Sequence, residues 1–537
     1  MVFLVDVNKT EEAAKDLLKN IEKEMVARGA VRQDSSEIHG AKINKWKLKN
    51  KRLKKPKFAF QTISNGWLLA SDNENIFREV LRRLAFFDQI KPNESLKSQT
   101  AFKNVAENTK FHELNAPPHV RWFVDPFGYV ELANAIADEE QEFKQRRNDW
   151  MGVLKKVGFD SIQGAGGSVA FHVEEHEILH RSYVYMPKGD KALEKQSVRG
   201  LFDFENKNQA TLIPPAFVPN DSSGFFAGTW DMAKALKNVG RVFDAFLKDE
   251  GAFENIVKEL ALQMEVDVKE VMKKFANEII VVAESQQPVS EDSERIMFAI
   301  KINGDAEFVF KNVQKAFPDS REIKIAGFNA LRIDAEEVVD PLDDPFGQPD
   351  FGDDDDEEEE EEEAQLHLLK KKIVVIKDNY LFLANDEQYL ADVLLKKHQT
   401  ELRNARDFAR VTKALAKLSQ KDRVSFRQFA RTDRVLRTNY EMIRQGKMGA
   451  SQTFLARLLN KAFSKQNAND DGPRAQKIKG AKLPEDYEKI ARYLGPSGWV
   501  METTEDGWLA TGCVLKKTNR EAVANKANNK PGPIRND

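Results

Sequence analysis

The chain begins with an alternation of apolar and polar residues that predicts a small unit of strands and helices. A short strand at 3–7 is followed by apolar residues at helical spacing, which predict a helix from Glu11 to Met25. Two alternating runs at 58–70 flank Asn65-Gly66, a strong hairpin signal because both turn positions need positive φ. The other elements expected in this unit are a strand at 38–48 and a closing helix at 73–84.

The same order of elements returns in the second half of the chain. A strand at 298–302 precedes a helix that Asp305 is expected to cap, and a strand or strand pair at 322–333 follows. A hairpin at 373–384 and a helix at 388–397 complete this second unit. We therefore expect an α+β fold with two related halves, built from repeated β-α-β-β-α units with mainly antiparallel sheets.

Short matches suggest how the repeats align. We align Ala70-Ser-Asp72 with Ala384-Asn-Asp386, so that Asp72 and Asp386 are the expected caps of the two closing helices. A third hairpin at 499–509 repeats the threonine, glycine, tryptophan and leucine of the first hairpin, and we expect its turn at Asp506-Gly507.

Changes in pattern predict the domain boundaries. A strand, a polar turn and a helix recur between the units, for example 224–231 leading into a helix from Met232 to Leu247. The expected parts are 1–120, the first β-α-β-β-α unit; 121–220, a strand-helix and β-rich middle segment; 221–445, the second half with the second unit and an acidic loop at 340–363; 446–515, a helix, linker and C-terminal hairpin; and 516–537, a disordered tail.

Composition narrows the class of protein. The chain has 537 residues and a formal net charge of −3, so it is long enough for several domains and has no overall preference for polyanions. Its single cysteine, Cys513, excludes internal disulfides and cysteine-based metal clusters. No apolar run approaches the roughly 18 residues of a transmembrane helix, so we expect no transmembrane segment. The sequence contains no nucleophile elbow and no phosphate-binding glycine loop, and we expect no cofactor.

Three histidines are the candidate metal ligands. His172-Val-Glu-Glu-His176 fits the inverted zinc-protease pattern, and His180 lies four residues further on. On a helix the three rings would share one face and could gather a metal ion. On a strand His172 and His176 would point to the same side but lie roughly 13 Å apart. Because the flanking runs at 168–173 and 178–186 alternate, we favour a solvated hairpin.

Two oppositely charged segments occupy the same place in the two units. The run 353–363 is wholly acidic, and like-charge repulsion predicts a solvated loop at 340–363. Deletion of 343–363 should change stability by less than about 1 kcal/mol, because surface loops contribute mainly a slowly varying closure entropy. The segment 42–57 contains nine Lys or Arg and no acid, with Trp46 between lysines. We favour a solvated face for this basic strand. The alternatives are pairing with the acidic loop and binding of a polyanion or nucleic acid.

Three features of the chain resemble an uncharacterised bacterial family. They are the repeated units, the hairpin end Gly66–Asp72, and the run Ile213–Pro219 with the strand and Asp231 that follow it. Members of that family are large exported or envelope-associated proteins that carry a domain of unknown function. The resemblance covers roughly residues 1–440 and implies no catalytic residues. Members usually begin with a signal peptide or lipid anchor. We therefore expect that the native gene extends upstream of Met1, which would make the protein exported or envelope-associated; otherwise it is cytoplasmic.

These observations favour a non-enzymatic binding or scaffold protein of the bacterial envelope, with another envelope protein or a polymer as partner. One alternative is a metal-dependent hydrolase that uses the His172–His176 segment. The other is a polyanion or nucleic-acid binder that uses the basic strand at 42–57.

Overall fold

The fold is that of a computed structural model of the chain. The structure describes residues 1–33, 35–49, 57–91, 95–132, 150–187, 198–202, 204, 212–266, 268–286, 289, 293–334, 371–397, 400–420, 423–445 and 483–518. The chain divides into two compact units. Unit 1 comprises Met1–Lys103 and Glu131–Arg147, and unit 2 comprises Asn104–Val130 and Asn148–Asp537.

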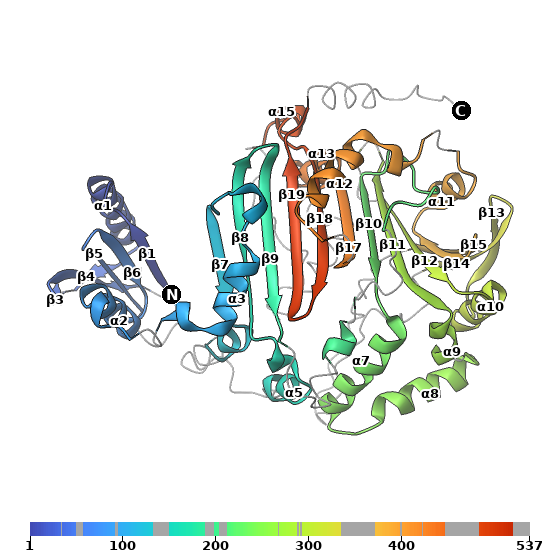
Figure 1. Ribbon diagram of the computed structural model, residues 1–537, viewed down its shortest axis with the longest axis horizontal. Helices are drawn as coiled ribbons and strands as arrows, with labels where there is room; N and C mark the ends of the chain where they lie inside the picture. The colour runs from blue at the N-terminus through green and yellow to red at the C-terminus, as the bar shows by residue number, and fades with distance from the viewer. Residues whose placement is uncertain are drawn as a thin grey trace. The chain divides into compact units, whose positions relative to one another are not determined.

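Unit 1 contains an antiparallel sheet with the strand order β1-β6-β5-β4-β2, in which β3 also pairs with β4 (Figure 1). The strands are β1 (Val2–Asp6), β2 (Val31–Arg32), β3 (Ser36–Ile38), β4 (Ala41–Leu48), β5 (Lys57–Ser64) and β6 (Trp67–Ser71). The turn between β5 and β6 is Asn65-Gly66, with φ angles of 50° and 74°. The positive φ values confirm the hairpin predicted from this residue pair.

The two helices of unit 1, α1 (Glu11–Ala27) and α2 (Glu74–Ala85), cover opposite faces of the sheet. Ala14 of α1 lies in a buried cluster with Val7 and Leu68. Phe77 of α2 lies in a separate cluster with Leu69. Because Leu68 and Leu69 are neighbours on β6, their side chains point to opposite faces of the sheet.

Unit 2 contains a long antiparallel sheet with the strand order β13-β14-β15-β16-β12-β11-β10-β17-β18-β19-β9-β8-β7. The strands are β7 (Val120–Val124), β8 (Gly164–Val173), β9 (His176–Tyr185), β10 (Gly224–Thr229), β11 (Phe275–Ser285), β12 (Glu294–Ile302), β13 (Arg321–Ile325), β14 (Phe328–Asp334), β15 (Lys371–Lys377), β16 (Tyr380–Ala384), β17 (Val424–Arg431), β18 (Pro496–Thr504) and β19 (Gly507–Leu515). Helix α3 (Thr100–Asn108) crosses from unit 1 into unit 2. The α-helices described within unit 2 are α5 (Trp150–Lys156), α7 (Met232–Leu247), α8 (Ala252–Met264), α9 (Val268–Lys273), α10 (Ala306–Ala316), α11 (Glu387–Leu394), α12 (Arg406–Ala416), α13 (Thr432–Arg444) and α15 (Glu488–Ala491).

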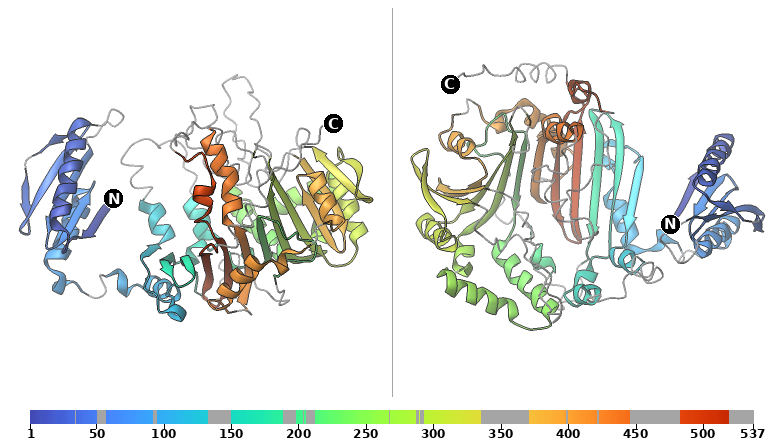
Figure 2. Two further views of the ribbon diagram at one scale, coloured as in Figure 1. Left: turned by 90° about the horizontal axis from the view of Figure 1, so that it is seen from above. Right: turned by 180° about the vertical axis from the view of Figure 1, so that it is seen from behind.

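Three groups of strands in the long sheet share one connectivity. In each group a strand is followed by helical segments and then by two strands that pair in chain order: β7-β8-β9, β10-β11-β12 and β17-β18-β19. The groups join through the pairs β9–β19 and β10–β17. Strands far apart in the sequence are therefore neighbours, as the red β19 beside the teal β9 shows in Figure 2.

The segment from β12 to α11 has the same arrangement as unit 1. Its strands pair in the order β12-β16-β15-β14-β13, which corresponds to β1-β6-β5-β4-β2. Its two helices also cover opposite faces. Val309 of α10 packs in one buried cluster with Leu381, and Leu390 of α11 packs in another with Phe382.

The hairpin registers correct the alignment made from the sequence by one residue. Ser71 pairs with Phe60, and Ala384 pairs with Ile373 at the corresponding place of the second hairpin. Ser71 therefore matches Ala384, which was aligned with Ala70. The turn of the third hairpin likewise lies one residue earlier than expected, because β18 ends at Thr504 and β19 begins at Gly507.

The helix caps agree with this correction. Asn73, not Asp72, caps α2, since its side-chain oxygen accepts a hydrogen bond from the Ile76 amide at 3.1 Å. Asp386 caps α11 as predicted and accepts from the amide of Tyr389 at 2.6 Å.

The prediction of an α+β fold with mainly antiparallel sheets is confirmed by these elements. Other expectations fall on residues that the structure does not describe. These are the acidic loop at 340–363, the helix and linker at 446–482, and the tail from 519 onward.

Candidate functional site

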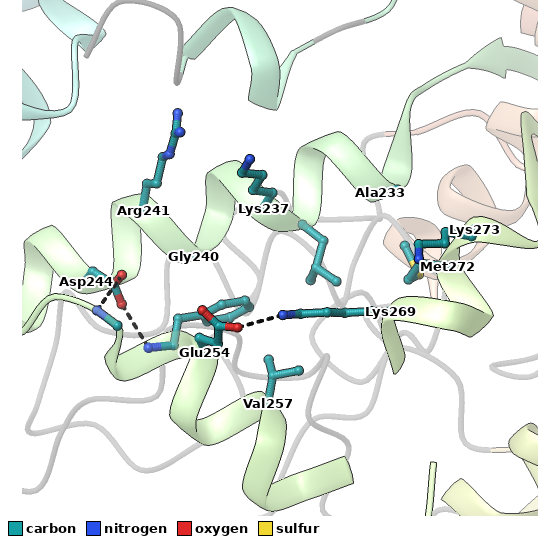
Figure 3. A pocket seen from close by; sticks show the side chains of 13 residues that line it. Ala233, Lys237, Gly240, Arg241, Asp244, Glu254, Val257, Lys269, Met272 and Lys273 are labelled. Atoms are coloured by element: carbon teal, nitrogen blue, oxygen red, sulfur yellow. Dashed lines mark hydrogen bonds and ion pairs between the residues drawn. The ribbon is translucent and has the colours of Figure 1, made fainter. Parts of the chain in front are cut away.

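A pocket of about 500 Å³ lies among α7, α8 and α9 of unit 2 (Figure 3). Its apolar lining comes from Ala233, Leu236, Gly240, Phe253, Val257 and Met272. Its charged lining comes from Lys237, Arg241, Asp244, Glu254, Lys269 and Lys273. A concave site of about 300–1,000 Å³ with an apolar interior and few polar groups is typical of small-molecule binding.

Helix α7 presents one side to the protein core and another to the pocket. Asp231 caps it by accepting a hydrogen bond from the Lys234 amide at 3.0 Å. Ala235 is buried, whereas Lys237 and Arg241 are exposed. Figure 3 shows these two basic side chains extending from the same side of α7, one turn apart. The helix was predicted from the sequence, but its cap and its role in a pocket were not.

Asp244 and Gly240 fix the approach of α8 to α7. The two carboxylate oxygens of Asp244 accept hydrogen bonds from the amides of Gly251, at 3.0 Å, and Phe253, at 2.8 Å. These amides belong to the N-terminal end of α8, where backbone donors otherwise lack partners. A Cβ at position 240 would lie 2.6 Å from Cδ1 of Phe253, so the glycine permits this close contact. The charge of Asp244 is thus committed to the fold.

The second acid of the pocket is also committed. Glu254 forms an ion pair with Lys269 at 2.9 Å and lies 3.7 Å from Lys258. The hydrogen bond from Lys269 lowers the pKa of Glu254 below its usual value. Within the described part of the chain, Lys237 has no hydrogen-bond or ion-pair partner. The pocket therefore combines an apolar interior with an available cation.

A separate cluster of charged residues surrounds Glu284 on β11. Burial, followed by the negative charge of Asp221, raises the pKa of Glu284 to about 7, although the positive charges of Arg295 and Arg434 oppose this shift. Arg295 pairs in register with Glu284 across β11 and β12 and lies 3.7 Å from the carboxylate of Asp386. A carboxyl group with such a pKa exchanges its proton near neutral pH, which is one property of general acids and bases.

The histidine segment folds as the β8–β9 hairpin and not as a helix. His172 is exposed, and its Nδ1 lies 2.7 Å from a carboxylate oxygen of Glu177. His176 is buried, and its Nδ1 lies 3.0 Å from the carbonyl oxygen of Val173. His180 lies on the same strand as His176, and burial lowers its pKa. The shared helical face that would gather the three rings is therefore absent from this hairpin. No group of three or more His, Cys, Asp or Glu suited to a metal ion occurs among the described residues.

In the described part of the basic strand, Lys45 and Trp46 are engaged by contacts within unit 1. Lys45 forms an ion pair with Glu74 of α2 at 3.1 Å, and its ammonium lies 4.6 Å from the ring centre of Phe58. Trp46 is buried, as its alternation with lysines predicts. Lys47 and Lys49 remain exposed.

Comparisons with known proteins give no match from which a ligand or an activity could be assigned to the pocket. No protein-family model, no curated protein and no solved structure matches this chain. Among the residues that the structure describes, no helix is both long enough and apolar enough to span a membrane.

Proposed function

We propose that this chain is a non-enzymatic binding protein whose ligand site is the pocket among α7, α8 and α9. The observation that carries the proposal is the pocket of about 500 Å³, which is lined in part by apolar side chains and whose two acids are engaged, Asp244 by backbone amides and Glu254 by Lys269. Acids held in this way keep helices in place and are poorly suited to transfer protons. A ligand is then recognised by shape and apolar contact, with the basic side chains at the edge of the pocket.

The test uses a neutral solvatochromic dye, Nile red, and a variant that fills the pocket. Ala233 is an exposed lining residue, so the larger side chain of Ala233→Trp occupies pocket space without disturbing the buried side of α7. Ala13→Trp is the matched control, because Ala13 is an exposed alanine on α1 in unit 1. We expect the wild type and Ala13→Trp to bind the dye and Ala233→Trp to lose binding. Equal dye binding by all three proteins would refute the proposal.

A scaffold role in the bacterial envelope extends this proposal. Its support is the resemblance of the repeated units and of Ile213–Pro219 to envelope-associated bacterial proteins. Fractionation of cells that express the native gene tests the location. Recovery of the protein in the cytoplasm alone would contradict an envelope role.

The repeated units carry a proposal of their own, namely that 1–91 and 294–397 arose by duplication. The support is the shared strand order, with helices on opposite faces in both segments. Relatives aligned separately over the two segments should match each other at structurally equivalent positions, such as Ser71 and Ala384. Similarity no better than that of unrelated β-α-β-β-α segments would speak against duplication.

A further inference from the structure

The charges around the pocket identify a class of ligand. Four basic and two acidic side chains line it. Asp244 is bound to the amides of α8, and Glu254 is paired with Lys269. Neither acid is free to receive a ligand cation. Lys269 is paired with Glu254 and Lys273 with Glu270, whereas Lys237 is a lining cation with no acid partner among the described residues.

Lys237 is the side chain that best meets a ligand anion. It lines the pocket from the exposed side of α7, next to the apolar Leu236 and one turn from Arg241. No described residue supplies it with an acid. An ammonium group at the edge of an apolar pocket attracts a ligand whose anionic group remains near water while its apolar part is buried.

We infer that the pocket binds a single-chain anionic amphiphile, with the apolar chain among α7, α8 and α9 and the anionic group on Lys237. This inference rests on the proposed function, because it requires that the pocket be a ligand site. The anionic group is a carboxylate or a phosphate, since both accept hydrogen bonds from an ammonium group. A free fatty acid and a single-chain phospholipid share this chemistry.

The test is calorimetric titration of the full chain with four ligands that share a ten-carbon chain: decanoate, decyl phosphate, decanol and decylammonium. All are used below the concentration at which they form micelles. A charge-assisted contact at the edge of a pocket predicts that the two anions bind about tenfold more tightly than decanol. Decylammonium should bind less tightly than decanol. The preference for anions should weaken at high salt, because Lys237 is exposed.

Two variants assign the anion to Lys237. Lys237→Gln should bind decanoate and decanol equally, and Lys237→Glu should prefer decylammonium. Lys413→Gln is the matched control, since Lys413 is an exposed lysine on α12 that also lacks a partner among the described residues. It should keep the anion preference of the wild type. Thermal melting of each variant verifies that it is folded.

The outcomes separate the inference from the proposed function. Equal binding of decanoate and decanol by the wild type, with loss of both in Ala233→Trp, would overturn the anionic class and leave the binding role standing. Anion binding that survives both Lys237→Gln and Ala233→Trp would overturn the site. Absence of binding by all four ligands and by Nile red would overturn both proposals. The relative affinities of decanoate and decyl phosphate distinguish a fatty acid from a phospholipid source.

Discussion

Replacement of Glu284 by glutamine should remove a pH dependence of stability that the structure locates in one side chain. Glu284 lies on β11 opposite Arg295. Burial and the charge of Asp221 raise its pKa to about 7 from a value of 4.5. Glutamine resembles the protonated carboxyl group in shape and hydrogen bonding, but it does not ionise. The variant therefore keeps the neutral form at every pH.

The sign and size of the effect follow from this pKa. A carboxyl group whose pKa is higher in the folded protein favours folding while it is protonated, and this contribution is complete below the unfolded pKa. It is lost as pH rises through about 7. A difference of roughly 2.5 units at about 1.36 kcal/mol per unit corresponds to about 3 kcal/mol. Relative to Glu284→Gln, the wild type should therefore lose about 3 kcal/mol between pH ~4.5 and ~8.

Urea unfolding of the two proteins at both pH values measures this difference. Glu259→Gln is the control, because Glu259 is an exposed glutamate on α8, away from the cluster around Glu284. It should follow the wild type at both pH values. If the wild type and Glu284→Gln differ by the same free energy of unfolding at both pH values, within about 0.5 kcal/mol, the burial of an ionisable Glu284 is refuted.

Three further predictions concern caps, a buried ion pair and a turn. Asn73→Ala and Asp386→Ala should each cost about 1 kcal/mol in urea titrations, because each cap accepts a hydrogen bond from a helix amide; an unchanged midpoint would contradict that role. Asp433→Ala should cost about 3–5 kcal/mol by the same measurement, since the Lys517 ammonium, 2.5 Å away and 5% exposed, loses its carboxylate; a cost below about 1 kcal/mol would exclude a buried pair. Gly66→Ala should lower the melting temperature because its φ is 74° and a Cβ would meet the side chain of Asn8, and an unchanged melt would contradict this turn.

Local signals in the sequence predicted many elements well. The strand and turn expected at 224–231 and the helix that follows agree with β10 and α7, and Asp305 caps its helix as expected. Asn65-Gly66 forms the expected turn. Each of these features depends on residues within one turn or one hairpin, so neighbouring letters are sufficient to specify it.

Aligning the two hairpins by identical residues was less reliable than aligning them by the register of their paired strands. Ala70 and Ala384 share an identity, but their positions in the hairpins differ by one residue. A shift of one residue moves a side chain to the other face of a sheet. Leu69 and Phe382 are the equivalent pair, and both pack toward the closing helix of their unit. The correct alignment of the two hairpins is therefore the one that places equivalent side chains on the same face of the sheet, and tertiary packing determines that face.

The candidate site was not visible in the sequence because its residues look ordinary along the chain. Lys237 and Arg241 are spaced four residues apart, as on any solvated helix face. The pocket appears only when α8 packs on α7, held by Asp244 and the close contact at Gly240. The environment of Glu284 likewise requires Asp221, which the folding of β10 and β11 brings near. The His172–His176 motif gave a clearer sequence signal, yet the segment folds as a hairpin and not as the helix that this metal-binding pattern requires.

The C-terminal hairpin, β18–β19, lies inside the long sheet because the β17–β19 group pairs with the β7–β9 group. β18 is hydrogen-bonded to β17 and β19, and β19 is hydrogen-bonded to β18 and β9. Each strand therefore has both edges paired, although the hairpin comes last among the described strands. Gly498 fits this central position, because a Cβ there would lie 2.6 Å from the carbonyl oxygen of Gln428 on β17. Since β19 joins the β7–β9 group to the rest, the sheet becomes continuous only when these last strands pair. The β9–β19 pairing joins residues about 330 positions apart, such as Arg181 and Thr511, so it adds to the non-local contacts that slow folding in β-rich topologies.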